Sequence, residues 1–280
     1  MDRTKSDLGL NSYNEYSKLG KDEPKNPLKK GFLRILRIGV ITWLLLLLIW
    51  SVAAHFTSPT FLPGPWKTIQ GVPSIAKNGI LFQDIRISLI RVIKGWSLGI
   101  VFAIPLGLLI GRFEKFGWLL EPLLNFFRFV PAIGFITLFL MWFGVGEGSK
   151  TALIFYATIF PVLINTITGV HSMDASYVEA AESLGASGAK IFFTVIVPST
   201  VPNIFTGIRL GLSGAIISIV AAEMLAASEG IGYLIYTSRL YYRTDWIFVG
   251  IVLLGMVGFL ADRLLLFLGK KFLNRYGVTG

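Results

Sequence analysis

The sequence contains no cysteine, and only 15% of its 280 residues are charged. The absence of cysteine excludes disulfides, thiol catalysis and cysteine-ligated metal sites. Soluble domains are typically about a quarter charged. Because 54% of this chain is hydrophobic, its composition favours a membrane protein.

The sequence also has few candidate catalytic residues. Its two histidines, His55 and His171, fall at opposite ends of predicted spans, and no nucleophile-elbow motif is present. The segment 144–151 contains Gly, Lys and Thr, but not in the Gly-Lys-Ser/Thr order of a phosphate-binding loop. We therefore expect no covalent chemistry in this chain, with a membrane enzyme as the weaker alternative.

Basic residues exceed acidic ones, giving a net charge of +10. They cluster beside apolar segments, where Lys and Arg set membrane orientation and contact lipid headgroups. No basic surface interleaved with aromatic residues remains elsewhere, so we expect no nucleic-acid binding.

Six apolar segments have lengths that suit membrane spans. They cover residues 38–54, 95–111, 119–143, 151–173, 198–226 and 246–268. The pattern predicts an all-α integral membrane protein with about six transmembrane helices. Residues 1–30 form a polar tail, 31–275 the transmembrane domain and 276–280 a second tail. Cationic clusters at 29–37, 112–115 and 270–275 place both termini in the cytoplasm. The proline-rich segment 57–83 and the segment 227–245 are expected to be external loops.

Small residues recur at four-residue spacing in two predicted spans. Such ridges let helix backbones approach closely in lipid, so we expect them at helix–helix interfaces. Which ridge meets a second subunit does not follow from the spacing. The positions are Gly95, Gly99, Ala103, Gly107 and Gly111 in one span, and Gly207, Gly211 and Ala215 in another.

A charge inside a span is costly unless it is paired or hydrated, so four polar or bent positions are candidates for a translocation pathway. They are Arg128, Pro131, Arg209 and Glu223. The alternative for both arginines is that they lie near the inner interface and extend to the headgroups. For Glu223 the alternative is a salt bridge with an external arginine. Asp262 and Arg263 are expected to pair with each other near the inner end of the last span.

The segment 174–198 is a polar, small-residue interval between two spans, on the cytoplasmic side of the predicted topology. Its acidic, alanine-rich start is unlike the basic face of a helix that lies on a bilayer. It reads Glu179-Ala-Ala, then Gly185, then Val195-x-Val-Pro198. This order resembles the loop motif of bacterial ABC importer permeases, with Val in place of Ile and Leu.

Further segments resemble the sulfonate, taurine, nitrate and bicarbonate branch of these permeases. They are 88–99, 105–111, 142–150 and 220–224, and the resemblance extends over about residues 40–272. It implies a type I importer fold and a homodimeric pathway for a small solute. The partners it implies are a second copy of the chain, a cytosolic ATPase dimer and an external binding protein. ATP and Mg would bind that ATPase, and this chain would hold no cofactor or metal.

The resemblance also assigns roles to the loop. Residues matching or flanking the motif would couple this chain to the ATPase: Glu179, Ala180, Ala181, Glu182, Leu184, Gly185 and Pro198. The segment 237–245 resembles sulfonate and taurine permeases more than nitrate permeases, so an organosulfonate is the favoured solute. Nitrate or bicarbonate is the alternative solute. A secondary transporter or channel that works without an ATPase is the alternative mechanism.

Overall fold

A computed structural model describes residues 39–77 and 79–278 of the chain. The predicted tail 1–30 and the cations at 29–37 lie outside these residues. The described residues form helices and no strand, which confirms the all-α fold class. The chain divides into two units, residues 1–65 and 66–280.

The first unit contains helix α3 (Val40–His55) and the turn that follows it. The apolar α3 buries none of its side chains within its unit. After α3 the chain folds back, and the indole Nε1 of Trp50 donates a hydrogen bond to the carbonyl of Pro63 at 3.0 Å. With 16 residues, α3 is shorter than the roughly 20 residues of a full span.

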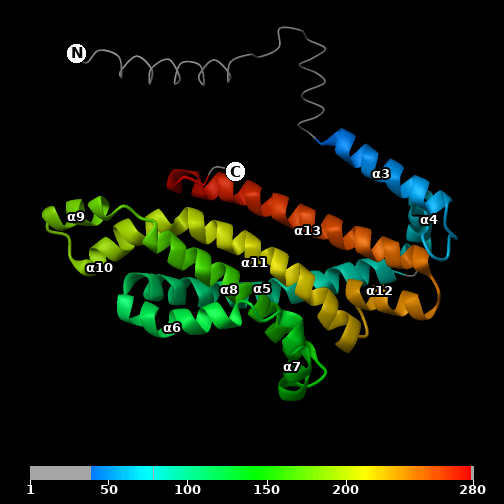
Figure 1. Cartoon of the computed structure of the whole chain (residues 1–280), viewed down its shortest axis with the longest axis horizontal. Helices are drawn as coiled ribbons and strands as arrows, with labels where there is room; N and C mark the ends of the chain where they lie inside the picture. Colours follow the sequence, from blue (N-terminus) through cyan, green and yellow to red (C-terminus); the bar gives the residue numbers. More distant parts are fainter. Residues whose placement is uncertain (1–38, 78, 279–280) are drawn as a thin grey trace, which may run out of the picture. The chain divides into compact units, whose positions relative to one another are not determined.

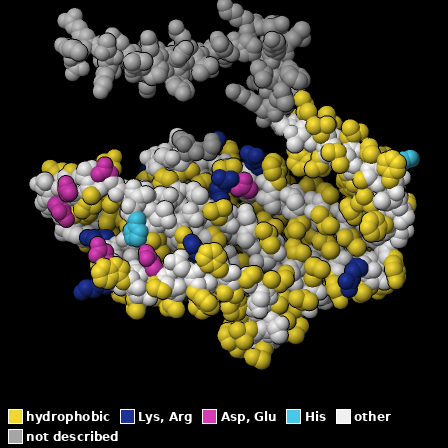
Figure 2. Space-filling view, in the orientation of Figure 1, with side chains coloured by type: hydrophobic (Ala, Val, Ile, Leu, Met, Phe, Trp, Pro, Cys, Tyr) yellow, Lys and Arg dark blue, Asp and Glu magenta, His cyan; other side chains and the backbone are white. Residues whose placement is uncertain are grey.

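The second unit contains all the longer helices, most of which lie side by side (Figure 1). Its helices are α4 (Pro65–Ala76), α5 (Ile80–Arg112), α6 (Glu114–Phe127), α7 (Ile136–Phe143), α8 (Glu147–His171), α9 (Ala175–Ser183), α10 (Gly188–Ile191), α11 (Val197–Ala226), α12 (Ile231–Leu240) and α13 (Thr244–Leu273). Among the described residues, four continuous helices are long and apolar enough to cross a membrane, 80–112, 147–171, 188–226 and 244–276, and the bent pair α6 and α7 could form a fifth span. Hydrophobic side chains cover most of the face seen in Figure 2.

Helix α8 lies between α5 and α11 and makes most of the packing contacts of this unit. The small-residue ridge of α5 faces a row of branched residues on α8, and the paired positions advance together along the two helices. Gly95 faces Ile154, Gly99 faces Thr158 and Gly107 faces Thr166. A Cβ atom at any of these glycines would come within 2.7 Å of the facing side chain, so only glycine allows this separation.

The second ridge packs on a neighbouring part of α8, and Thr158 contacts a glycine of each ridge. Gly207 lies against Asn165 and Val162, and Gly211 lies against Thr158 and Val162. In lipid, close backbone contact of this kind is a main source of helix association. Both predicted ridges therefore lie in interfaces within one chain.

The predicted third span, 119–143, is broken. Helix α6 ends at Phe127, and a 3₁₀ turn (Ala132–Phe135) leads into α7 at 87° to α6 (Figure 1). The break falls at Arg128 and Pro131, the two residues expected to interrupt this span. Pro131 has no N–H and cannot continue the helical hydrogen bonds.

Two segments predicted to be loops are helical, which corrects the prediction. Helix α4 occupies 12 residues of 57–83 despite Pro73 and buries Thr68, Gly71 and Ile75 on one face. Helix α12 lies within 227–245 and packs on α13 and α11. In both cases burial of one helical face outweighs the local turn signals.

We predict that Gly99→Ala destabilises the protein, because the new methyl group would lie 2.7 Å from Thr158 and force α5 away from α8. Overpacking of this kind costs about 1–3 kcal/mol. The melting temperature of the purified protein in one detergent should fall. Gly255→Ala in α13 is the matched control, since nothing lies within 4 Å of a Cβ there. Equal melting temperatures for the two variants would contradict the packing argument.

Candidate functional site

The segment after α8 forms a short exposed helix, α9, at one end of the second unit (Figure 1). The carboxylate of Asp174 caps it by accepting a hydrogen bond from the Ser176 N–H at 2.9 Å. This hydrogen bond lowers the pKa of Asp174, so the cap stays ionised at neutral pH. Acidic side chains gather at this end in Figure 2.

One face of α9 packs on the protein and the other is free. Val178 and Ala181 lie against a buried cluster that includes Ile191 and Ile196. Glu179, Ala180 and Glu182 are exposed, and Leu184 is 88% exposed. An exposed leucine beside two carboxylates is a surface suited to a protein partner.

Gly185 ends α9 in the left-handed conformation, at φ 75°. Its N–H donates to the carbonyl of Glu182, and the N–H of Ala186 donates to that of Ala181. This pair of bonds is a Schellman cap, in which a residue with a side chain at the glycine position is strained. Gly185 therefore sets the angle at which the chain leaves α9.

The chain then enters one continuous helix, 188–226. A π-helical turn (Phe192–Ile196) precedes Pro198, and the Val197 N–H donates to the Phe192 carbonyl. Because Pro198 has no N–H, the widened turn accommodates it without ending the helix. Pro198 of the motif thus lies inside the continuous helix that connects the exposed segment to α11.

A buried charge cluster lies at the other end of the helices. Arg91 of α5 is 3% exposed and Glu223 of α11 is 1% exposed. Their Nη1 and Oε1 atoms are 2.9 Å apart. Arg91 also pairs with Glu147 of α8 at 2.7 Å and donates to the carbonyl of Glu229 at 2.7 Å. Glu223 is therefore paired with an arginine, and in this chain it does not face an exposed surface.

Further hydrogen bonds tie this cluster to the start of α12. Glu223 accepts hydrogen bonds from the Ser88 hydroxyl at 2.7 Å and from the Gly232 N–H at 2.9 Å. Asp84 accepts one from the Gly230 N–H at 2.7 Å. The cluster thus joins four helices, and no side-chain polar atom buried in the described part of the chain lacks a partner. Beside it lies a polar pocket of about 460 Å³, bordered by Glu147.

Sequence reasoning did not find this cluster as a unit. The sequence nevertheless contained a pattern that indicates it. Asp84, Ser88 and Arg91 precede Gly95 at intervals of four, three and four residues, so they lie on the same helix face as the glycine ridge. Polar residues on a helix face that packs inside the protein need buried partners. The partners come from α8 and α11, which no local pattern could specify.

Arg209 forms a second ion pair. Its Nε and Nη2 atoms donate to the two carboxylate oxygens of Asp262 on α13, at 2.8 and 3.0 Å. The expected pair of Asp262 with Arg263 is wrong, because successive residues project from a helix in different directions. Arg263 instead lies over the ring of Phe259. Arg209 lies between Gly207 and Gly211, the two glycines that face the middle of α8.

Arg128 is exposed at the break between α6 and α7. Its Cζ atom is 4.7 Å from the centre of the Phe129 ring, and no salt bridge joins it to another described residue. The hydroxyl of Tyr156 on α8 donates to the carbonyl of Phe127 at 2.7 Å. In a continuous helix, the Phe127 carbonyl would accept a hydrogen bond from the N–H of residue 131, but Pro131 has no N–H.

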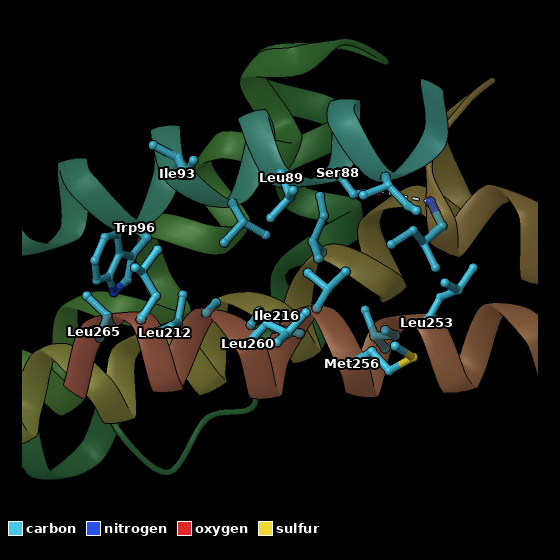
Figure 3. A pocket seen from close by; sticks show the side chains of 18 of the residues that line it. Ser88, Leu89, Ile93, Trp96, Leu212, Ile216, Leu253, Met256, Leu260 and Leu265 are labelled. Carbon is cyan, nitrogen blue, oxygen red and sulfur yellow. Dashed lines mark hydrogen bonds between the residues drawn. The ribbon is translucent and has the colours of Figure 1, made fainter. Parts of the chain in front are cut away.

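Figure 3 shows a groove between α5 and α13, with a volume of about 760 Å³. Leu89, Ile93 and Trp96 line one side, and Leu253 and Leu260 line the other. The indole N–H of Trp96 is already bonded to the Ile208 carbonyl. The lining is almost entirely apolar, so this groove is not a candidate site for a polar solute. Within the described residues, no group of three His, Cys, Asp or Glu side chains is placed to hold a metal ion.

Residues 103–274 match the family described as the binding-protein-dependent transport system inner membrane component. The chain belongs to this family. It is an inner-membrane ABC importer permease of the sulfonate and taurine branch. Permease subunits of this kind do not themselves hydrolyse ATP, which is the task of a separate subunit.

Among similar proteins is the taurine transport system permease protein TauC of Escherichia coli, 34% identical over 86% of this chain and 87% of TauC. The putative aliphatic sulfonates transport permease protein SsuC of Bacillus subtilis is 34% identical over 84% of this chain and 86% of SsuC. The formylaminopyrimidine transport permease protein ThiX of Halalkalibacterium halodurans is 30% identical over 78% of this chain and 87% of ThiX.

Among solved structures, an inward-facing conformation of the MetNI methionine ABC transporter has a similar fold. Its TM-score is 0.56 at 16% identity, covering 68% of this chain and 96% of that chain. The likeness confirms the type I importer fold predicted from the sequence.

We predict that Glu223→Ala strongly destabilises the permease, because it leaves the buried Arg91 without one of its two carboxylates. Removing one partner of a buried pair costs about 3–5 kcal/mol. Glu147→Ala should cost less, since the Glu147 side chain is 55% exposed. Melting temperatures in a single detergent test this order, and an equal or reversed order would contradict it.

Proposed function

We propose that this permease forms, as a homodimer, the membrane pathway of an ATP-driven importer for a small anionic solute. The favoured solute is an organosulfonate such as taurine, delivered by an external binding protein. The exposed segment around α9 lies on the cytoplasmic side and docks onto the ATPase. The observation that carries this proposal is the geometry of that segment, with one face packed and the other free.

The two faces of α9 suit a coupling element. Docking needs accessible side chains, and Glu179, Glu182 and Leu184 are accessible. The small Ala180 between them allows a partner surface to come close. Transmission needs a stiff connection, which the continuous helix from Gly188 to the end of α11 supplies. A movement of α9 would therefore move α11, which packs on α8.

Selection of an anion is supported by the charges that remain accessible. Among the four residues expected along the pathway, Glu223 is buried and neutralised by Arg91, which favours a structural role for it. Arg128 is exposed, and about a third of the Arg209 side chain is exposed beside Asp262. The accessible charges along the expected pathway are therefore Arg128, which is cationic, and the Arg209–Asp262 pair, which is neutral.

The names of the relatives support a sulfonate more than nitrate or bicarbonate. Taurine and aliphatic sulfonates are named for relatives at 34% identity, and a formylaminopyrimidine for one at 30%. Nitrate or bicarbonate carried by the same class of importer is the alternative. In the reconstituted complex with its ATPase and binding protein, we expect taurine or ethanesulfonate to stimulate ATP hydrolysis. Stimulation by nitrate or bicarbonate alone would overturn the sulfonate assignment.

We predict that Gly185→Val abolishes coupled uptake while the protein still inserts in the membrane. A left-handed conformation costs a non-glycine residue about 1–2 kcal/mol, more for a β-branched one, so the Schellman cap and the direction of α9 should change. Uptake and co-purification with the ATPase measure the effect.

The matched control is Gly188→Val, three residues away. Gly188 is also exposed, has no neighbour within 4 Å of a Cβ, and has an ordinary backbone conformation. It should retain uptake. Normal uptake and normal ATPase association in Gly185→Val would rule out the coupling role of this cap. Uptake that persists without any ATPase subunit would instead favour a secondary transporter.

A further inference from the structure

The break between α6 and α7 lies deep within the predicted membrane region. The Tyr156 hydroxyl bonds the carbonyl of Phe127, so the break is held beside Tyr156 of α8. Tyr156 is nine residues from the Glu147 end of α8 and fifteen from the His171 end. At about 1.5 Å per residue, these distances are about 13 Å and about 22 Å.

Arg128 adjoins this break and lies within the predicted span 119–143. A cation at this depth costs several kcal/mol unless it is paired or hydrated.

Arg128 also lacks the compensation that Arg209 has. Arg209 faces the middle of the same helix α8 and is held by both oxygens of Asp262. No described carboxylate is in salt-bridge contact with Arg128. Glu121, on the same face of α6, is seven residues away, which is about 10 Å of helix. The guanidinium lies over the face of the Phe129 ring, and no salt bridge to another described residue occupies its N–H donors.

The carbonyl groups at the end of α6 carry partial negative charge. The Phe127 carbonyl accepts hydrogen bonds from the Tyr156 hydroxyl and from the Val130 N–H, so it is not a free acceptor beside Arg128. Arg128 adds a full positive charge next to it.

We infer that Arg128 is an anion-binding residue at the middle of the membrane pathway, where its guanidinium binds the sulfonate group of the solute through paired N–H donors. This inference rests on the proposed function for the identity of the solute. Arginine presents a planar fork that matches two oxygens of an oxyanion, which lysine does not.

The test uses the natural absence of cysteine. Phe129→Cys places a thiol next to Arg128 in the full chain, in membrane vesicles. Two reagents of similar size are compared: 2-sulfonatoethyl methanethiosulfonate, which is itself an alkanesulfonate, and its trimethylammonium counterpart. We expect the sulfonate reagent to react faster, and this preference to fall about tenfold or more in Phe129→Cys with Arg128→Gln. Arg128→Lys should restore part of it, and ethanesulfonate should slow the labelling only while Arg128 is present.

The matched control is Phe259→Cys beside Arg263 on α13, with and without Arg263→Gln. The two sites share an exposed ring 4.7 and 4.9 Å from an arginine Cζ with no described salt bridge. Arg263, however, lies on α13 and not at the break between α6 and α7. We expect no loss of sulfonate preference there. An unreactive thiol at position 129, or an unchanged preference after Arg128→Gln, would overturn the inference.

This measurement does not depend on the coupling proposal. Labelling needs neither ATP nor the binding protein, so it can fail while Gly185→Val still abolishes uptake. The opposite result, with sulfonate preference at position 129 and normal uptake in Gly185→Val, would remove the coupling role and keep the anion site.

Discussion

The close approach of α5 and α11 to α8 is the constraint on which the rest of the structure depends. In lipid there is little hydrophobic gain in bringing apolar helices together, so backbone contact must supply the attraction. Gly95, Gly99 and Gly107 of α5 and Gly207 and Gly211 of α11 remove the side chains that would prevent it. We call α5, α8 and α11 the three-helix frame. The ion pairs of Arg91 and Arg209 involve residues of this frame, and the break beside Arg128 is hydrogen-bonded to it through Tyr156.

Three arginines on or beside these helices have different partners, and the differences indicate their roles. Arg91 is fully buried with two carboxylates and joins four helices, so it stabilises one arrangement of them. Arg209 is held by Asp262 in a partly exposed pair between α11 and α13. Arg128 is exposed and has no described carboxylate partner. A charge in a bilayer is costly unless it is paired or hydrated. Buried carboxylates compensate Arg91, whereas we propose that solute or water compensates Arg128.

The exposed α9 segment and the deep charges are connected through α11. The helix that starts after the Gly185 cap is the same helix that carries Arg209 and ends at the Glu223 cluster. A change in the angle of α9 would therefore act on the ion pair with α13 and on the buried cluster. In a transporter, this connection gives one route by which a partner at one end can alter the other.

The amino-acid sequence by itself determined the class of the protein, most of its spans and the position of its exposed segment. Composition, the four-residue glycine spacing and the Glu179–Pro198 motif depend on local order, and each was readable without coordinates. The helices α4 and α12 were missed because local prolines and polar residues indicated loops, whereas tertiary burial of one face made them helical.

Only the tertiary structure decided which charges meet. The sequence placed Asp262 beside Arg263 and left Glu223 with any external arginine, but ion pairs form between helices whose relative rotation and register no single helix contains. The glycine register of α5 on α8 brings Arg91 level with Glu147, and the rotation of α11 brings Glu223 to the same point. The depth of Arg128 was likewise set by a contact between helices, the hydrogen bond from Tyr156 that holds the break at the middle of α8.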